Sequence, residues 1–230
     1  MTSYVFPPAA HPAVPVEGGD VLFPVGRIIC VAKNYRDHRI EMGGDDRKPP
    51  FFFMKPASAL TPSDKVPFPA DTENLHYEGE FCLALGPAQE DRSQFGRTSL
   101  FGTAVGVDLT RRDRQAAAKE NGHPWERAKA FPGSAPIGMI TRCSALPSAE
   151  ATLSLSLNGE IRQSTKIGAM IWSASEILAE INAQFGLMPG DIIYTGTPAG
   201  VGPLVPGDRV EVAATGCRTH RFQMIAAPAI

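Results

Sequence analysis

The stretch His76–Pro87, HYEGEFCLALGP, places two carboxylates immediately before a run of apolar residues. In a strand, residues two positions apart point to the same face, so Glu78 and Glu80 present their carboxylates side by side. The apolar run and the closing Gly86-Pro87 pair are typical of a buried strand that ends in a turn. Two like charges are costly to bury unless a cation or proton offsets them, whereas solvated surface glutamates need neither. The segment therefore predicts either a cation site at the start of a core strand or an exposed acidic edge.

Asp108 adds a third acid at the end of another apolar run, TAVGVDL, which covers residues 103–109. On its own, an acid in this position is equally typical of a helix cap or a turn. Together with Glu78 and Glu80 it completes a set of three carboxylates supplied by strands. Oxygen donors of this kind suit a hard divalent cation, Mg²⁺ or Mn²⁺ more than Zn²⁺. Such a site leaves about three octahedral positions for water and a chelating substrate.

The composition of the whole chain favours a domain rich in short strands. Of its 230 residues, 22 are Gly and 21 are Pro, above the usual share of ~12% for the two together, and the hydrophobic fraction is 43%. The excess predicts many turns and excludes a helical bundle, and the hydrophobic fraction excludes a disordered chain. Strands are expected at 27–32, 51–55, 78–85, 103–109 and 152–162, the last with an Asn158-Gly159 hairpin, and helices at 113–121 and 173–185. We expect an α+β, β-rich fold with few short helices.

The chain divides into an arm and one domain. Residues 1–24 carry five prolines and no helical periodicity, so we expect an extended N-terminal arm laid against the body. Residues 25–230 predict a single domain, in which 34–50 form a helix and loop suited to a lid. The four cysteines lack any CxxC spacing, which predicts free thiols instead of a disulfide framework.

The charge balance excludes several classes of partner. With 22 basic and 24 acidic residues and a formal net charge of -2, the chain has no electrostatic basis for binding nucleic acid or an anionic membrane. No stretch approaches the ~18 apolar residues of a membrane span, and no signal-peptide pattern opens the sequence. We expect a soluble, cytoplasmic protein.

Three further segments carry residues suited to chemistry. His38 and Glu41 are adjacent on one helix face, where a carboxylate can orient an imidazole as a general base, although a surface His–Glu pair has the same spacing. Lys129 lies among apolar residues in WERAKAF (125–131), which makes it a candidate site residue, although an ordinary surface lysine also fits this segment. The loop TGTPAGVG (195–202) follows a strand, and its amides and hydroxyls can hold a carboxylate. It lacks the lysine and spacing of a P-loop, which disfavours nucleotide binding.

These segments, in their order along the chain, resemble the fumarylacetoacetate hydrolase family. The resemblance covers about residues 25–215, and its joint order is specific although each motif alone is weak. The motifs are NYRDH with Glu41 (34–41), FMKP (53–56), YEGE (77–80), DLTRRDRQ (108–115), Trp125 with Ala128-Lys129, NGE (158–160), MIWS (170–173) and PGDIIYTGTPAGVG (189–202). The phenylalanine-rich strand and proline-rich start look most like the bacterial fumarylpyruvate hydrolases of the gentisate pathway.

The resemblance implies a mixed β-roll built around a metal and assembled as a homodimer. It implies metal ligation by Glu78, Glu80 and Asp108. It also implies that His38 and Glu41 form a water-activating dyad on a helix that orders over bound substrate. Lys129 would face the substrate, and the implied contacts to carboxylate or carbonyl groups are Arg112, Gln115 and Thr197.

The chain departs from the family pattern at a few positions. Gly79 stands where the family often has a larger apolar residue, and Phe81 where leucine is common. Arg111 and Arg112 replace a smaller residue plus arginine, which leaves open which of the two points into the pocket. The implied metal ligands are intact.

The expected activity is hydrolytic C–C cleavage of an acylpyruvate, with fumarylpyruvate giving fumarate and pyruvate. An alternative within the family is decarboxylation, tautomerisation or isomerisation of oxaloacetate or another 2-oxo acid, several of which need no attacking water. A third alternative is a metal-binding protein that has lost catalysis.

Overall fold

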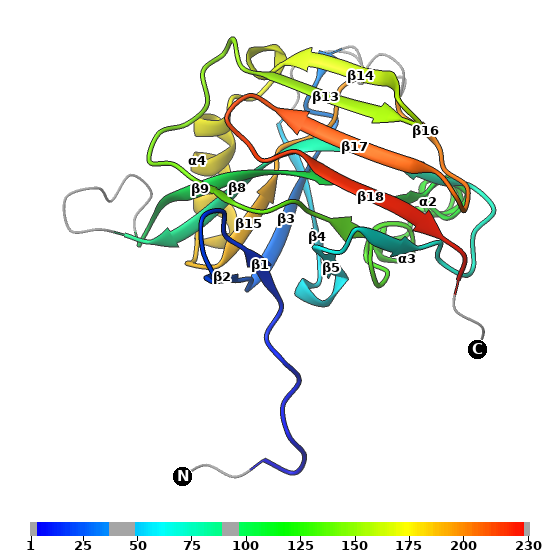
Figure 1. Cartoon of the computed structure of the whole chain (residues 1–230), viewed down its shortest axis with the longest axis horizontal. Coiled ribbons are helices and arrows are strands. Elements are labelled where there is room, and N and C mark those ends of the chain that lie inside the picture. The colour runs from blue at the N-terminus through cyan, green and yellow to red at the C-terminus, as the bar shows by residue number, and fades with distance from the viewer. Residues whose placement is uncertain (1–3, 37–48, 89–96, 228–230) are drawn as a thin grey trace.

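Two large β-sheets make up most of the computed structural model, which describes residues 4–36, 49–88 and 97–227 (Figure 1). The six-stranded sheet contains β3 (Arg27–Ala32), β4 (Phe51–Lys55), β8 (Gly79–Pro87), β9 (Thr98–Val107), β12 (Thr141–Arg142) and β15 (Asp191–Tyr194). The five-stranded sheet contains β6 (Lys65–Pro67), β13 (Thr152–Leu157), β14 (Glu160–Lys166), β17 (Arg209–Ala214) and β18 (His220–Ile225). Their strand orders are β12-β9-β8-β15-β3-β4 and β14-β13-β17-β18-β6.

Small sheets and short helices complete the described part of the chain. The small sheets pair β1 (Ala13–Pro15) with β2 (Leu22–Pro24), β5 (Leu60–Thr61) with β11 (Ala135–Pro136), and β7 (Leu75–Tyr77) with both β10 (Thr110–Arg111) and β16 (Gly202–Pro203). The helices are α2 (Arg112–Glu120), α3 (Glu126–Lys129) and α4 (Ala174–Phe185), with 3₁₀ turns η1 (Ala57–Ala59) and η2 (Ile167–Ala169). Parallel pairs (β15 with β3, β18 with β6) occur beside antiparallel ones. The expected β-rich, mixed α+β fold is confirmed.

The six-stranded sheet is buried on both faces. Along β8, Phe81, Leu83 and Leu85 pack in a core shared with the five-stranded sheet and α4, whereas Cys82 and Ala84 face a second core that includes the β1–β2 pair. A strand covered on both sides carries apolar residues in succession instead of alternating with polar ones. This explains why the predicted core strands read as continuous apolar runs.

Most predicted elements are present with small shifts of their ends. The strand expected at 103–109 begins earlier, at Thr98, and ends at Val107. Asn158 (φ 54°) and Gly159 (φ 87°) both take the left-handed conformation that a two-residue hairpin turn requires. The differences between the expected and observed bounds of β9 lie at the two ends of the strand, where the apolar pattern is weakest.

Helix α4 begins with a capping box. The Ser173 hydroxyl accepts from the Glu176 amide while the Glu176 carboxylate accepts from the Ser173 amide. Ile177 is buried, as are Leu178 and Ile181, but Phe185, one turn after Ile181, is 41% exposed. The last helical turn reaches the edge strand β4, where the Phe185 ring meets Phe52 edge-to-face at 6.0 Å instead of entering the core.

The N-terminal region differs from the expected arm. Tyr4, Val5 and Phe6 are 71%, 101% and 73% exposed, and the segment that contains them extends away from the body instead of packing against it (Figure 1). The following residues form the β1–β2 hairpin, in which Val14 and Phe23 are buried. The proline-rich composition therefore describes an extended segment only before the hairpin.

All four cysteines are free, with Cys30 and Cys82 buried and Cys143 and Cys217 half-buried. No helix in the described ranges is long and apolar enough to cross a membrane.

Candidate metal centre and active-site pocket

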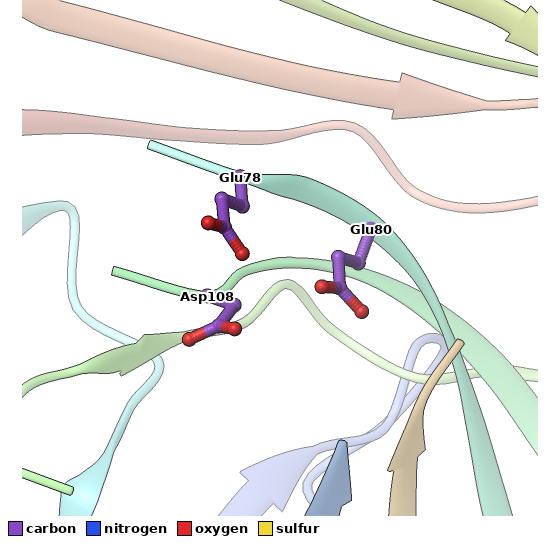
Figure 2. A group of neighbouring side chains, drawn as sticks. All are labelled: Glu78, Glu80 and Asp108. Atoms are coloured by element: carbon purple, nitrogen blue, oxygen red, sulfur yellow. The ribbon is translucent and has the colours of Figure 1, made fainter. Parts of the chain in front are cut away.

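Glu78, Glu80 and Asp108, here called the acidic triad, come together at one end of the β8–β9 pair (Figure 2). Glu78 lies between β7 and β8, Glu80 is the second residue of β8, and Asp108 directly follows β9. The two strands are antiparallel, and the Asp108 amide donates to the Glu78 carbonyl oxygen at 2.8 Å, so the acid ending one strand faces the acids starting the other. One carboxylate oxygen from each residue lies within 4.8 Å of the others. All three residues are buried, which excludes an exposed acidic edge.

The electrostatics of the acidic triad favour a bound cation. Burial raises the pKa of Glu80 well above its ordinary value, and the charges of Asp108 and Glu78 raise it further. The Gly196 amide donates to Glu80 Oε2 at 2.7 Å, which acts in the opposite direction. A bound cation would offset the burial and repulsion that disfavour the ionised form of Glu80. Three clustered carboxylates are oxygen ligands that suit a hard divalent ion such as Mg²⁺ or Mn²⁺.

Lys129, on the last turn of α3, is a buried member of this cluster and not a surface lysine. Its ammonium lies 2.8 Å from Glu78 Oε2 and 2.5 Å from Asp108 Oδ2, and it donates to Thr110 Oγ1 at 2.6 Å. Burial lowers the pKa of Lys129, but the charges of Asp108 and Glu78 outweigh that effect and leave the pKa above its ordinary value. The side chain is therefore cationic at neutral pH.

Lys55 is a second buried lysine of the site, to which the sequence assigned no role. It is the last residue of β4, and its ammonium lies 2.8 Å from Asp108 Oδ1. It also donates to the main-chain carbonyl oxygens of Leu109 and Lys129. The available signal is a charged residue that ends an apolar strand, the same signal that identified Asp108.

Arg112, and not Arg111, points toward the acidic triad. The Arg112 guanidinium donates to Glu78 Oε1 and to Gln115 Oε1, each at 2.7 Å. Arg112 opens α2 and Gln115 lies three residues later, so both share one helix face. The Arg111 guanidinium instead lies over the Phe131 ring, 4.4 Å from its centroid.

The triad lies at the base of a pocket that carries both charged and aromatic groups. Arg112, Gln115, Lys129 and Thr197 line it together with Phe53 and Trp125. The Phe53 and Trp125 rings lie 6.0 Å apart, and Phe51 meets Trp125 edge-to-face at 5.1 Å. Every predicted site residue within the described ranges thus reaches one pocket.

The glycine-rich loop after β15 closes one side of this pocket. Its Gly196 amide holds a carboxylate, as the sequence predicted, but the carboxylate is that of Glu80. Thr197 is buried beside it and hydrogen-bonds to Gly79 and to Gln163, a residue that the sequence did not single out. Gln163 lies on an otherwise largely exposed strand, which gave no sign of its position.

The proposed water-activating dyad, His38 and Glu41, lies outside the described residues, and its role stays a prediction. The segment that precedes it is fixed by Asn34. The Asn34 amide group donates to the carbonyl oxygens of Thr195 and Trp172 at 2.8 and 3.0 Å, and its oxygen accepts from the Trp172 amide at 2.9 Å.

The sheet-dominated fold and a pocket lined by an acidic triad that could hold a divalent metal define a class of protein that comparison with known proteins identifies. Residues 27–224 match the fumarylacetoacetate (FAA) hydrolase C-terminal family, and the chain belongs to this family. Its members are enzymes, some of them hydrolases and others isomerases or tautomerases.

Similar proteins include both types of activity. A fumarylpyruvate hydrolase from Pseudomonas aeruginosa, solved in complex with Mn²⁺ and pyruvate, is similar with a TM-score of 0.90 and 39% identity, covering 97% of this chain and 100% of that one. Oxaloacetate tautomerase YcgM of Escherichia coli (strain K12) is 36% identical over 209 residues, 87% of this chain and 93% of that protein. Fumarylpyruvate hydrolase of Ralstonia sp is 36% identical over 162 residues, 70% and 84% of the two chains.

Proposed function

We propose that this protein is a divalent-metal-dependent hydrolase that cleaves the C–C bond of an acylpyruvate, with fumarylpyruvate as its preferred substrate. The observation that carries the proposal is the buried acidic triad that shares one pocket with Lys129, Arg112 and Gln115. The similarity to a fumarylpyruvate hydrolase that was solved with Mn²⁺ and pyruvate supports it.

The charges around the pocket favour an anionic substrate. The three carboxylates of the acidic triad face three cationic side chains, those of Lys55, Lys129 and Arg112. The cluster is therefore close to neutral before a metal binds, and a divalent ion would make it positive. A substrate with two carboxylates, as fumarylpyruvate and oxaloacetate have, restores the balance.

In the proposed reaction the acidic triad holds Mg²⁺ or Mn²⁺, which when bound supplies Lewis-acid polarisation of the 2-oxo group. Arg112 and Gln115 contact the carboxylate and carbonyl groups of the substrate, and Thr197 contacts the substrate beside them. His38, oriented by Glu41, takes a proton from water while the water oxygen bonds to the distal carbonyl carbon. The C–C bond then breaks, and its electron pair passes to the pyruvate fragment as an enolate, which Lys129 stabilises until it takes up a proton.

The aromatic wall of the pocket supports an acyl substrate longer than oxaloacetate. Phe53 and Trp125 line the pocket, and Phe51 packs edge-to-face against Trp125. Flat aromatic faces pack well against a planar, conjugated chain such as a fumaryl group. Oxaloacetate has no such extension.

A second candidate function is tautomerisation of oxaloacetate. The groups suited to binding and polarising a 2-oxo acid all lie in the described part of the pocket, and a keto–enol exchange needs no attacking water. The similarity to oxaloacetate tautomerase YcgM favours this reading. Oxaloacetate decarboxylation is a variant of the same chemistry, and loss of catalysis is the remaining alternative.

One product analysis separates these activities. The protein, loaded with Mg²⁺ or Mn²⁺ or freed of metal with EDTA, is given fumarylpyruvate or oxaloacetate. Formation of fumarate and pyruvate supports the proposal, enol loss without CO₂ supports tautomerisation, and CO₂ release supports decarboxylation. His38→Ala should abolish hydrolysis and leave the Mn²⁺ dissociation constant within about threefold. Full activity of that variant contradicts the proposed role of the dyad.

The remaining expectations are also proposals. We propose a cytoplasmic homodimer. Sedimentation velocity over a range of protein concentrations tests its assembly.

A further inference from the structure

Gln163 joins the two large sheets beneath the pocket. It lies on β14 of the five-stranded sheet and is 1% exposed, although most of that strand faces solvent. Its Oε1 accepts from the Gly79 amide of β8 at 2.9 Å. Its Nε2 donates to Thr197 Oγ1 and to the Pro198 carbonyl oxygen, both at 2.8 Å. One side chain thus contacts the strand of the acidic triad and the glycine-rich loop together.

The orientation of this amide is determined by its backbone partners. The Gly79 N–H can only donate, so it must meet the Gln163 oxygen. The Pro198 carbonyl can only accept, so it must meet the Gln163 nitrogen. These two partners exclude a flipped amide, because the flip would place donor against donor and acceptor against acceptor.

The same logic fixes the hydroxyl proton of Thr197. Because Gln163 Nε2 donates to Thr197 Oγ1, that oxygen accepts there. Its own single proton is directed to the Gly79 carbonyl oxygen at 2.9 Å. A hydroxyl has one proton and two lone pairs, so Thr197 keeps one lone pair for the pocket. It can therefore accept a hydrogen bond from a substrate or a water but has no proton left to donate.

This arrangement depends on Gly79. A Cβ at that position would lie 2.9 Å from Leu155 Cδ1, closer than real Cβ atoms approach, and 3.0 Å from Gln163 Oε1, a distance at which the Gln163 side chain would have to shift. The larger apolar residue that the family often has here would displace the Gln163 side chain. The glycine thus makes room for the amide that links β8 to the loop.

We propose that Gln163 is a positioning residue: by holding Gly79 and Thr197 together, it turns the Thr197 hydroxyl into a fixed hydrogen-bond acceptor facing the substrate. The inference rests on the proposed function, since it assigns Thr197 a contact with the substrate. It also sharpens that contact, because Thr197 then meets a protonated group such as an enol hydroxyl or the attacking water and not a carboxylate.

A double-mutant cycle tests the proposal. Gln163→Met keeps the length of the side chain and removes its donors and acceptor, and Thr197→Val removes the hydroxyl with little change of shape. Loss of an outer partner of this kind typically costs about 10- to 100-fold in activity. We expect each variant to lose about that factor in kcat, and the double variant to fall within about threefold of the weaker single one. Thr197→Ser, which keeps the hydroxyl, should retain most of the activity while Gln163 is present.

The matched control is Gln223→Met. Gln223 lies on β18 of the same sheet and donates to the Gly207 carbonyl oxygen at 3.2 Å, away from the pocket. Its kcat should stay within about twofold of wild type. Losses that multiply in the double variant, or a Gln163→Met enzyme with more than a third of the wild-type kcat, overturn the proposal.

Two further measurements keep the test decisive. If Gln163→Met does not fold, Gln163→Glu replaces it in the cycle, since it preserves volume and the acceptor for Gly79 but removes the donors. The cycle is also measured by calorimetry on the affinity of the Mn²⁺-loaded protein for lactate, whose hydroxyl can donate to Thr197, with pyruvate, which has no proton to donate, as the control ligand. Wild-type protein that turns over neither substrate refutes the proposed function, whereas the lactate cycle still decides the role of Gln163: non-additive losses of lactate affinity support it and additive ones overturn it.

Discussion

Lys55→Met is the perturbation that most directly tests how the acidic triad is stabilised. The lysine is 2% exposed, and its ammonium lies 2.8 Å from Asp108 Oδ1 and contacts the carbonyl oxygens of Leu109 and Lys129. Methionine keeps most of the apolar length, so the substitution removes the charge and the donors but leaves little cavity. Asp108 then loses one of its two lysine partners in a buried environment.

The expected cost follows from this burial. Removing one partner of a buried ion pair costs about 3–5 kcal/mol, because the remaining charge stays desolvated. For a chain of this size that corresponds to a fall in Tm of roughly 6–20 °C, at about 2–4 °C per kcal/mol. A divalent ion at the triad replaces the lost positive charge, so the deficit should narrow when Mn²⁺ is present in excess of its dissociation constant.

Urea unfolding followed by tryptophan fluorescence measures both effects, once in EDTA and once in excess Mn²⁺. The control is Lys65→Met, at an exposed lysine of the short strand β6, where a change within about 0.5 kcal/mol is expected. A loss below about 1 kcal/mol for Lys55→Met in EDTA, or a deficit that does not narrow with Mn²⁺, refutes the reasoning.

Three further predictions concern the same site. Lys129→Met should lower kcat at least about 100-fold in a coupled pyruvate assay while Mn²⁺ binding, followed by calorimetry, is retained; lost Mn²⁺ binding contradicts this. Because burial and its acidic neighbours raise the pKa of Glu80 above 4.5, its ionisation destabilises the metal-free fold as pH rises above that value. Mn²⁺ affinity should accordingly fall as pH drops through the raised pKa of Glu80, because binding then releases a proton. A Mn²⁺ affinity that does not change with pH contradicts this prediction. Gly79→Ala should cost about 1–3 kcal/mol in urea unfolding, since its Cβ would crowd Leu155 and Gln163, and a neutral result contradicts the described packing.

The acidic triad was predictable because its members stand where the sequence carries its clearest signals. Glu78 and Glu80 open an apolar strand and Asp108 closes another, so the local pattern marked each acid as a candidate, and the resemblance of the ordered motifs to a known family assigned the three to one site. Their burial then decided between a cation site and an exposed edge. The β-rich fold followed from the same patterns, because turn residues and apolar runs are read over a few neighbouring positions.

The partners of the triad were harder to predict because tertiary contacts place them. Lys55 contacts Asp108, a residue far from it in the sequence, and the local pattern of its own strand does not indicate which residue its side chain meets. Gln163 lies on a strand whose neighbours face solvent, and its side chain is buried between Gly79 of β8 and the loop at Thr197. The choice of Arg112 over Arg111 depended on where α2 begins, a boundary that the sequence places to within a residue or two.

The pocket draws its groups from β4 and β8 of the six-stranded sheet and from the helices α2 and α3, and Gln163 of β14 in the five-stranded sheet holds β8 and the Thr197 loop beneath it. Any opening that separates the two sheets would therefore dismantle the site, and a ligand bound there would resist that opening. Binding should slow amide hydrogen exchange in strands far from the pocket as well as beside it, and protect the body from proteolysis. For this protein, occupancy of the site would therefore set the lifetime of the folded chain against proteolysis, in addition to its role in catalysis.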